Sequence, residues 1–275
     1  MAQWTDGRAE KLGLRDCELE YACWGPAPEQ APTLVLLHEG LGSLGLWKGF
    51  GEGLANATGL GVCAFSRAGY GRSSAIGLPR PLDYMTREAQ DVLPQVLDAL
   101  GVRRAILLGH SDGASIAAIY AGSVSDRRVR GLILIAPHFF TETQGLAAIR
   151  AAQDNFTNGG LRARLARHHN DPDGAFQGWA NAWLDPGFAD WNIADVIDHW
   201  RIPVLAIQGR DDPYGTLAQI DEIDSRIYAP LETVILQGCG HAPHLECAEE
   251  TQAAIVDFCA RLTRIEAEQV RLDGL

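Results

Sequence analysis

The segment that most constrains the fold is residues 105–121, where a short apolar run leads through Gly-His-Ser-Asp-Gly at 109–113 into an alanine-rich stretch. This order predicts a strand that turns sharply into a helix, with Ser111 at the turn. Glycine two positions before and after the serine leaves room for the neighbouring chain. We therefore predict that Ser111 adopts a strained conformation that lifts its hydroxyl clear of a sheet, as a nucleophile would need. The alternative is an ordinary turn serine.

Apolar runs and helical stretches alternate along the chain. Several runs carry Val, Ile and Leu at successive positions, which indicates strands that are covered on both faces and so a mostly parallel sheet. Strands alternating with helices predict a doubly wound α/β fold. The strand-like runs are Thr33–His38, Gly61–Ser66, Ala105–Gly109, Gly131–Ala136, Pro203–Gln208 and Glu232–Leu236. The clearest helical stretches are Asp83–Leu100, Ser111–Ala121 and Glu249–Arg264, the first with a kink expected at Pro94.

The alternation of strands and helices stops at residues 137–200, which contain many aromatic residues and no convincing buried strand. We expect a helical insertion after the sixth strand, with residues 1–136 and 201–275 forming the core of one α/β domain. The aromatic residues have two interpretations. They form the insertion's own small core, or they line an apolar pocket as a lid over Ser111.

Composition narrows the class of protein. The formal net charge is −12 and the isoelectric point is about 5.1, which argues against nucleic acid and anionic membrane surfaces as partners. The sequence shows no basic-then-apolar leader and no apolar run of membrane-spanning length, so a cytoplasmic protein is expected. The composition does not indicate an oligomeric state.

Metal and disulfide sites are not indicated. The six cysteines lie far apart without a C-x-x-C pair, and most are expected to be buried free thiols. The adjacent His168 and His169 lie on a polar stretch, where histidines are usually surface residues and not ligands. We expect neither a metal nor an organic cofactor.

A serine hydroxyl needs a base to take its proton, and the base needs an orienting carboxylate. Gly-Arg-Asp-Asp at 209–212 follows one predicted strand, and Gly-Cys-Gly-His at 238–241 follows the next. Catalytic groups collect where parallel strands end. The order serine, aspartate, histidine is the one expected for this type of strand-to-helix turn.

Together, these motifs resemble those of α/β-hydrolase fold enzymes over most of the chain, from about Leu14 to Arg264. Leu-Leu-His-Glu-Gly-Leu-Gly at 36–42 and Ser-Arg-Ala-Gly-Tyr-Gly-Arg-Ser-Ser at 66–74 complete the pattern. The resemblance implies that His241 is the base and Asp212 the orienting acid, with Asp211 as the competitor.

The resemblance also implies an oxyanion hole, which needs two preset donors. These would be the backbone N–H groups of Asp112 and, by position, Gly40. Glu39 departs from the pattern, since family members usually carry glycine there. Its side chain is expected to pair with a cation such as Arg67, or else to lie at the pocket edge and select substrates.

The side chain of Asp112 also has two interpretations. It stabilises the start of a helix through the dipole, or it attracts a substrate ammonium group, as in an aminoacyl ester. Candidate substrate-binding residues are Glu39, His138, Trp179 and Trp183.

The expected function is a serine hydrolase that cleaves a small or medium ester-type bond in a small-molecule substrate through an acyl-enzyme. Lactonase, thioesterase, carbon–carbon bond hydrolase, amidase and peptidase activities stay open within the same fold. Serine at position 111 speaks against dehalogenase and epoxide hydrolase activity, which need a carboxylate there. The alternative from another class is a noncatalytic small-molecule receptor, which would need no triad.

Overall fold

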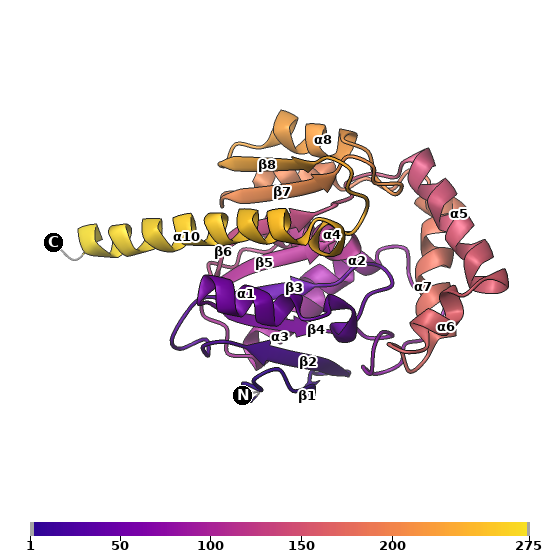
Figure 1. Ribbon diagram of the computed structural model, residues 1–275, viewed down its shortest axis with the longest axis horizontal. Coiled ribbons are helices and arrows are strands. Elements are labelled where there is room, and N and C mark those ends of the chain that lie inside the picture. The colour runs from indigo at the N-terminus through magenta and orange to yellow at the C-terminus, as the bar shows by residue number, and fades with distance from the viewer. Residues whose placement is uncertain (1–2, 274–275) are drawn as a thin grey trace.

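The computed structural model describes residues 3–273, which form an eight-stranded sheet in the order β1-β2-β4-β3-β5-β6-β7-β8 (Figure 1). β2 pairs antiparallel with β1 and β4, and all other neighbours are parallel. The predicted mostly parallel α/β fold is confirmed. The strands are β1 (Glu10–Gly13), β2 (Glu18–Trp24), β3 (Thr33–Leu37), β4 (Gly61–Phe65), β5 (Ala105–His110), β6 (Val129–Ile135), β7 (Val204–Gly209) and β8 (Leu231–Leu236).

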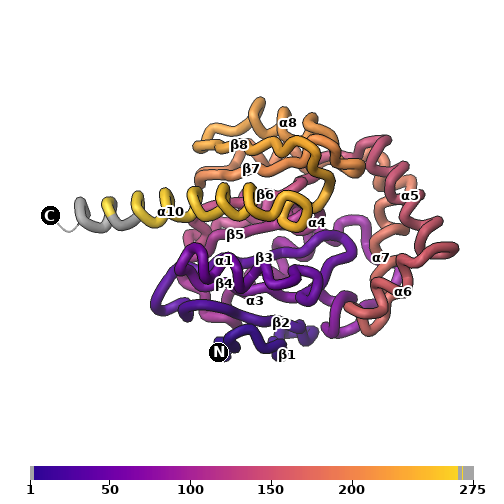
Figure 2. The backbone as a smooth tube through the Cα atoms, viewed as in Figure 1, coloured from indigo at the N-terminus to yellow at the C-terminus, as the bar shows by residue number. Residues whose placement is uncertain are grey.

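Helices connect the strands. Those outside the insertion are η1 (Leu44–Trp47), α1 (Phe50–Thr58), α2 (Tyr84–Arg87), η2 (Glu88–Val92), α3 (Leu93–Ala99), α4 (Asp112–Ser123), α8 (Ala218–Arg226), α9 (Pro243–Glu246) and α10 (Ala248–Asp273). α10 ends at Asp273, beyond Arg264, and its first turns pack on the sheet beside α1 (Figure 2). Among residues 3–273, no helix has both the length and the apolar composition needed to cross a bilayer.

The sheet is buried on both faces because successive side chains of a strand point to opposite sides. In β3, Val35 and Leu37 join one hydrophobic cluster, and the alternate residues Leu34 and Leu36 join the other. Helices α3, α4 and α8 cover the first face, and α1 and α10 cover the second. This two-sided core explains the unbroken apolar runs in the sequence.

The predicted helix at 83–100 is divided by a π-helical turn, Glu88–Val92, that ends just before Pro94. Proline has no N–H to donate to the carbonyl four residues earlier, so the regular ladder is interrupted there. The predicted kink therefore takes the form of a local change in helix type.

The chain between β6 and β7 is helical, as expected for residues 137–200. It contains α5 (Thr143–Asn158), α6 (Leu161–Leu165), α7 (Pro172–Leu184), η3 (Pro186–Phe188) and η4 (Ala194–His199). α5, α6 and α7 stand beside the sheet, on the side opposite the free end of α10 (Figure 1). Phe156 and Phe176 stack with ring centroids 4.0 Å apart, so part of the aromatic content does form a small core of the insertion.

Candidate active site

Ser111 lies at the turn between β5 and α4, in the strained conformation that the sequence predicts. Its φ is 54° and its ψ is −120°, a region that L-residues rarely adopt. A Cβ atom at Gly109 would overlap the carbonyl of Gly113, and one at Gly113 would overlap the carbonyl of Leu37. The two glycines therefore allow the helix to start against β3 and β5 while the serine side chain stays free.

Ser111, His241 and Asp212 form a hydrogen-bonded series, which we call the Ser-His-Asp chain. His241 Nε2 lies 2.9 Å from Ser111 Oγ, and His241 Nδ1 lies 2.8 Å from Asp212 Oδ2. Because the carboxylate can only accept, Nδ1 carries the ring proton and Nε2 accepts from the serine hydroxyl. It is Asp212, and not the competitor Asp211, that contacts the imidazole.

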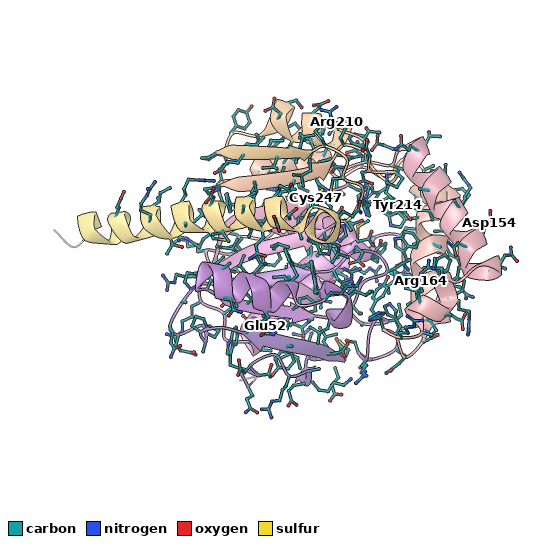
Figure 3. The ribbon with its side chains drawn as sticks, in the orientation of Figure 1. Glu52, Asp154, Arg164, Arg210, Tyr214 and Cys247 are labelled. Carbon is teal, nitrogen blue, oxygen red and sulfur yellow. The ribbon has the colours of Figure 1, made fainter. Side chains whose placement is uncertain are left out.

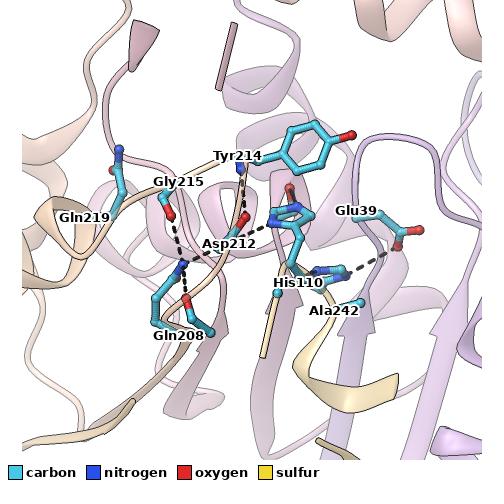
Figure 4. A network of polar contacts seen from close by, with 12 residues as sticks. Glu39, His110, Gln208, Asp212, Tyr214, Gly215, Gln219 and Ala242 are labelled. Carbon is cyan, nitrogen blue, oxygen red and sulfur yellow. Dashed lines mark hydrogen bonds and ion pairs between the residues drawn. The ribbon is translucent and has the colours of Figure 1, made fainter. Parts of the chain in front are cut away.

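Asp212 is fixed by two further donors (Figure 4). Gln208 Nε2 donates to Oδ2 at 2.9 Å, and the Tyr214 amide donates to Oδ1 at 2.8 Å. Burial alone would raise the pKa of Asp212, but hydrogen bonds from His241 and the Tyr214 amide outweigh it, and the net pKa lies below its ordinary value. The carboxylate therefore stays ionised and can stabilise an imidazolium at His241.

The loop after β3 orients the Glu39–Gly40 peptide. The Glu39 carbonyl accepts from His38 Nδ1 at 2.7 Å and from Arg67 Nη2 at 3.1 Å. In a trans peptide the N–H points opposite to the carbonyl, so the Gly40 N–H points away from the buried Arg67. At the start of α4, the Asp112 N–H belongs to the first turn, whose amides have no acceptor within the helix.

The Asp112 carboxylate is buried and already partnered. It accepts from the Tyr84 hydroxyl, from Trp183 Nε1 at 3.2 Å, and lies 4.0 Å from Arg67 Nη2. Burial raises the pKa of Asp112 above its ordinary value in spite of the opposing effect of Arg67. These contacts favour a structural role for this carboxylate over the binding of a substrate ammonium group.

A cavity of about 200 Å³ opens onto Ser111 and His241. Its wall includes every predicted site residue apart from Asp212, which lies behind the imidazole: Glu39, Gly40, Ser111, Asp112, His138, Trp179, Trp183 and His241. The insertion adds Glu142, Leu146 and Ile149, and Tyr214 lies between the sheet and α5 (Figure 3). No Lys or Arg lines this cavity among the described residues.

Two expectations about individual side chains are wrong. The Glu39 carboxylate does not pair with Arg67, which binds the main chain of residue 39; its partner is His110, with Nδ1 3.6 Å from Oε2. His169 is not a surface residue: its Nδ1 accepts from the Gly71 amide and its Nε2 lies 2.9 Å from the Leu41 carbonyl. A buried histidine thus joins the insertion to two loops of the sheet edge.

The cysteines are free thiols, as expected. Four of the six are buried. Within the part of the chain that the structure describes, no group of His, Cys, Asp or Glu side chains is arranged to hold a metal ion.

Several residues that shape the site were not predicted from the sequence. Gln208 is the last polar residue of an apolar strand, four positions before Asp212, which is a signal that could have been used. Tyr84 and Glu142 had no such signal, because each reaches the site from a segment remote in sequence.

The chain belongs to the alpha/beta hydrolase fold family, whose family model matches residues 32–190. It is 24% identical over 291 residues to a proline iminopeptidase of Lactobacillus helveticus, covering 90% of this chain and 96% of that one. It is 37% identical over 115 residues to the human 1-acylglycerol-3-phosphate O-acyltransferase ABHD5, covering 42% of this chain and 32% of that one. The chain thus matches about a third of the length of the acyltransferase.

Solved structures show the same fold. The crystal structure of a putative lipase from Acinetobacter baumannii superposes with a TM-score of 0.78 at 18% sequence identity, covering 95% of this chain and 93% of that one. A likeness at this low identity concerns the fold and not the substrate.

Proposed function

We propose that this protein is a serine hydrolase that cleaves a small or medium carboxylic ester through an acyl-enzyme. The observation that carries the proposal is the Ser-His-Asp chain, with both hydrogen bonds made and the serine open to a cavity. A noncatalytic receptor would need the cavity but not this connected nucleophile, base and acid.

In the proposed mechanism, His241 Nε2 takes the proton of Ser111 as Oγ attacks the ester carbonyl carbon. The amides of Gly40 and Asp112 stabilise the resulting oxyanion. His241 then gives its proton to the departing alkoxide, which leaves as an alcohol. Water, deprotonated by the same base, attacks the acyl-enzyme, and the carboxylic acid leaves while the proton returns to Ser111.

We further propose that residues 137–200 act as a lid over a core formed by residues 1–136 and 201–275. Trp179 and Trp183 of α7, with Leu146 and Ile149 of α5, line the cavity with mainly apolar side chains. Such a lining suits a compact acyl group.

The charges around the cavity favour a neutral or cationic acyl group. Glu142 supplies a carboxylate whose hydrogen-bond donors are all neutral, and no Lys or Arg is among the described lining residues. Glu39 and Asp112 also line the cavity, but their carboxylates lie beside His110 and Arg67, respectively. The nearby His138 adds no positive charge at neutral pH, because burial and the neighbouring His241 lower its pKa to about 3. Lactones fit this environment, whereas thioesters of anionic carriers would meet repulsion.

A second candidate is the release of an amino-terminal residue from a peptide. The match to a proline iminopeptidase extends over most of both chains, and a free ammonium group would be attracted to the Glu142 carboxylate in the cavity wall. The same Ser-His-Asp chain would then attack an amide carbonyl.

The test compares kcat/KM for nitrophenyl esters, lactones, acyl thioesters and amino-acid anilides, each with wild type and with Ser111→Ala. The proposal predicts highest kcat/KM on a short neutral ester and loss of turnover in Ser111→Ala. Preference for proline anilide would establish the second candidate instead. Binding of these compounds without turnover in wild type would favour the receptor.

A further inference from the structure

Glu39 and His110 form a second carboxylate–imidazole pair beside the Ser-His-Asp chain (Figure 4). Glu39 Oε2 lies 3.6 Å from His110 Nδ1, and the two side chains are 27% and 3% exposed. On the other side of the ring, His110 Nε2 lies 2.7 Å from the carbonyl oxygen of His241. His110 therefore stands between the loop that carries Gly40 and the loop that carries the proposed base.

Both ring nitrogens of His110 face acceptors. A nitrogen 2.7 Å from a carbonyl oxygen must carry the proton of that hydrogen bond, so Nε2 is a donor. Nδ1 is buried and makes no hydrogen bond within the described residues, and the group that faces it is the Glu39 carboxylate. The His110 ring therefore fills the space between the Glu39 carboxylate and the His241 carbonyl, and it contacts both through its two nitrogens.

The carboxylate of Glu39 remains charged in this position. Burial alone would raise the pKa of Glu39, but the adjacent His110, assisted by His38 and His244, lowers it, and the net pKa lies well below the ordinary value. Glu39 is thus ionised across the neutral range.

Both the main chain and the side chain of Glu39 have partners in the site. His38 and Arg67 donate to its carbonyl, while His110 faces its carboxylate. The next amide along the chain is that of Gly40, the proposed oxyanion donor. Any shift of Glu39 would therefore move this donor relative to Ser111.

On the basis of the proposed serine hydrolase function, we propose that Glu39 and His110 are positioning residues that fix the Gly40 amide relative to the His241 backbone. The pair connects the oxyanion donor to the base across the nucleophile. Neither side chain exchanges a proton with the substrate. Both act by holding the two loops at a fixed position relative to each other. This gives a function to the glutamate that stands where similar enzymes usually carry glycine.

The test uses Glu39→Gln, His110→Gln and the double variant, assayed on a neutral nitrophenyl ester. Glutamine at 110 can still donate to the His241 carbonyl, so a loss in that variant reports the contact with Glu39. Each single variant should lower kcat about 10- to 100-fold, since misplacement of catalytic groups by about 1 Å costs up to that much. KM should stay within about twofold, and the double variant should be no slower than the slower single one, because the two residues act as a unit.

Glu20→Gln is the matched control, since Glu20 is another buried carboxylate, bonded to Ser66 and Arg72 and absent from the cavity wall. It should leave kcat unchanged. Thermal unfolding checks that each variant is folded. If His110→Gln does not fold, the proposal is tested with Glu39→Gln alone, by measuring its rate of inactivation by a fluorophosphonate. This rate should fall with kcat.

Three outcomes would overturn the positioning role while leaving the proposed hydrolase function intact. They are an unchanged kcat in Glu39→Gln, losses of kcat that multiply in the double variant, and an effect that is confined to KM. Wild-type protein that neither hydrolyses esters nor reacts with the fluorophosphonate would overturn the proposed function and this inference with it.

Discussion

The sheet edge and the helical insertion build opposite walls of one cavity from different chemistry. On the sheet side, Ser111 and His241 sit where strands end and are held by hydrogen bonds and by a strained backbone. On the insertion side, Leu146, Ile149 and Trp179 present mostly apolar surface. The difference suggests that bond cleavage depends on the sheet edge and that substrate choice depends on the insertion.

The two walls are not independent, because Trp183 of the insertion donates to Asp112 beside the nucleophile. Trp179 likewise lies against Gly40, where a Cβ atom would overlap its indole ring. We therefore expect variants on the sheet side to change kcat and variants on the insertion side to change substrate selectivity. Variants where the two walls touch should change both.

The largest effect is expected on the sheet side, from His241→Ala. Without the imidazole, Ser111 Oγ has no proton acceptor among the described residues, and kcat on a neutral ester should fall by about 10⁶-fold. Steady-state turnover measures this. A loss of less than roughly a hundredfold would show that another group serves as the base.

Asp212→Asn should lower kcat by about 10⁴-fold, since an amide in place of the carboxylate favours the wrong tautomer of His241. Asp211→Asn is the control, because its side chain does not contact the imidazole, and its kcat should match wild type. Equal losses in the two variants would contradict the assignment of Asp212.

Gly40→Ala tests the contact between the two walls. The added methyl group would overlap Trp179 and displace the proposed oxyanion donor, so kcat should fall by about 10²- to 10³-fold. Combining it with Trp179→Ala should restore part of the loss if crowding is the cause. Gly77→Ala is the control, since a Cβ atom there meets nothing within 4 Å. Full activity in Gly40→Ala would rule out this amide as a donor.

The smallest effect is expected on the insertion side, from Glu142→Gln. Its carboxylate accepts from the Thr216 amide, the Thr216 hydroxyl and Gln219 Nε2, which are all neutral donors and leave its charge uncancelled. The ratio of kcat/KM for nitrophenyl butyrate over mono-nitrophenyl succinate should fall roughly tenfold. Asp154→Asn, on the outer side of α5 (Figure 3), should leave the ratio unchanged. An unchanged ratio in Glu142→Gln would show that the insertion does not select substrates by charge.

The sequence was most informative where a residue's neighbours along the chain dictate its conformation. The strand-to-helix turn at Ser111 follows from two glycines and an apolar run, and the parallel strands follow from runs without polar alternation. β1 and β2 were not predicted. β1 is the edge strand and is mostly exposed, and in β2, which lies between β1 and β4, the charged residues Glu18 and Glu20 interrupt the apolar pattern.

Side-chain partners were harder to predict because they depend on packing between distant segments. The partner of Glu39, in the loop after β3, is His110 at the end of β5, 71 positions away, whereas Arg67 was the cation named from the sequence. His169 was misjudged for the same reason, since its polar neighbours gave no sign that Gly71 and Leu41 would enclose it.

The most direct test of the central claim is reaction of the intact protein with a fluorophosphonate, followed by mass spectrometry of its peptides. We expect stoichiometric labelling on Ser111 that is abolished in Ser111→Ala and strongly slowed in His241→Ala. Folded wild-type protein that stays unlabelled, or carries the label on another residue, would contradict it.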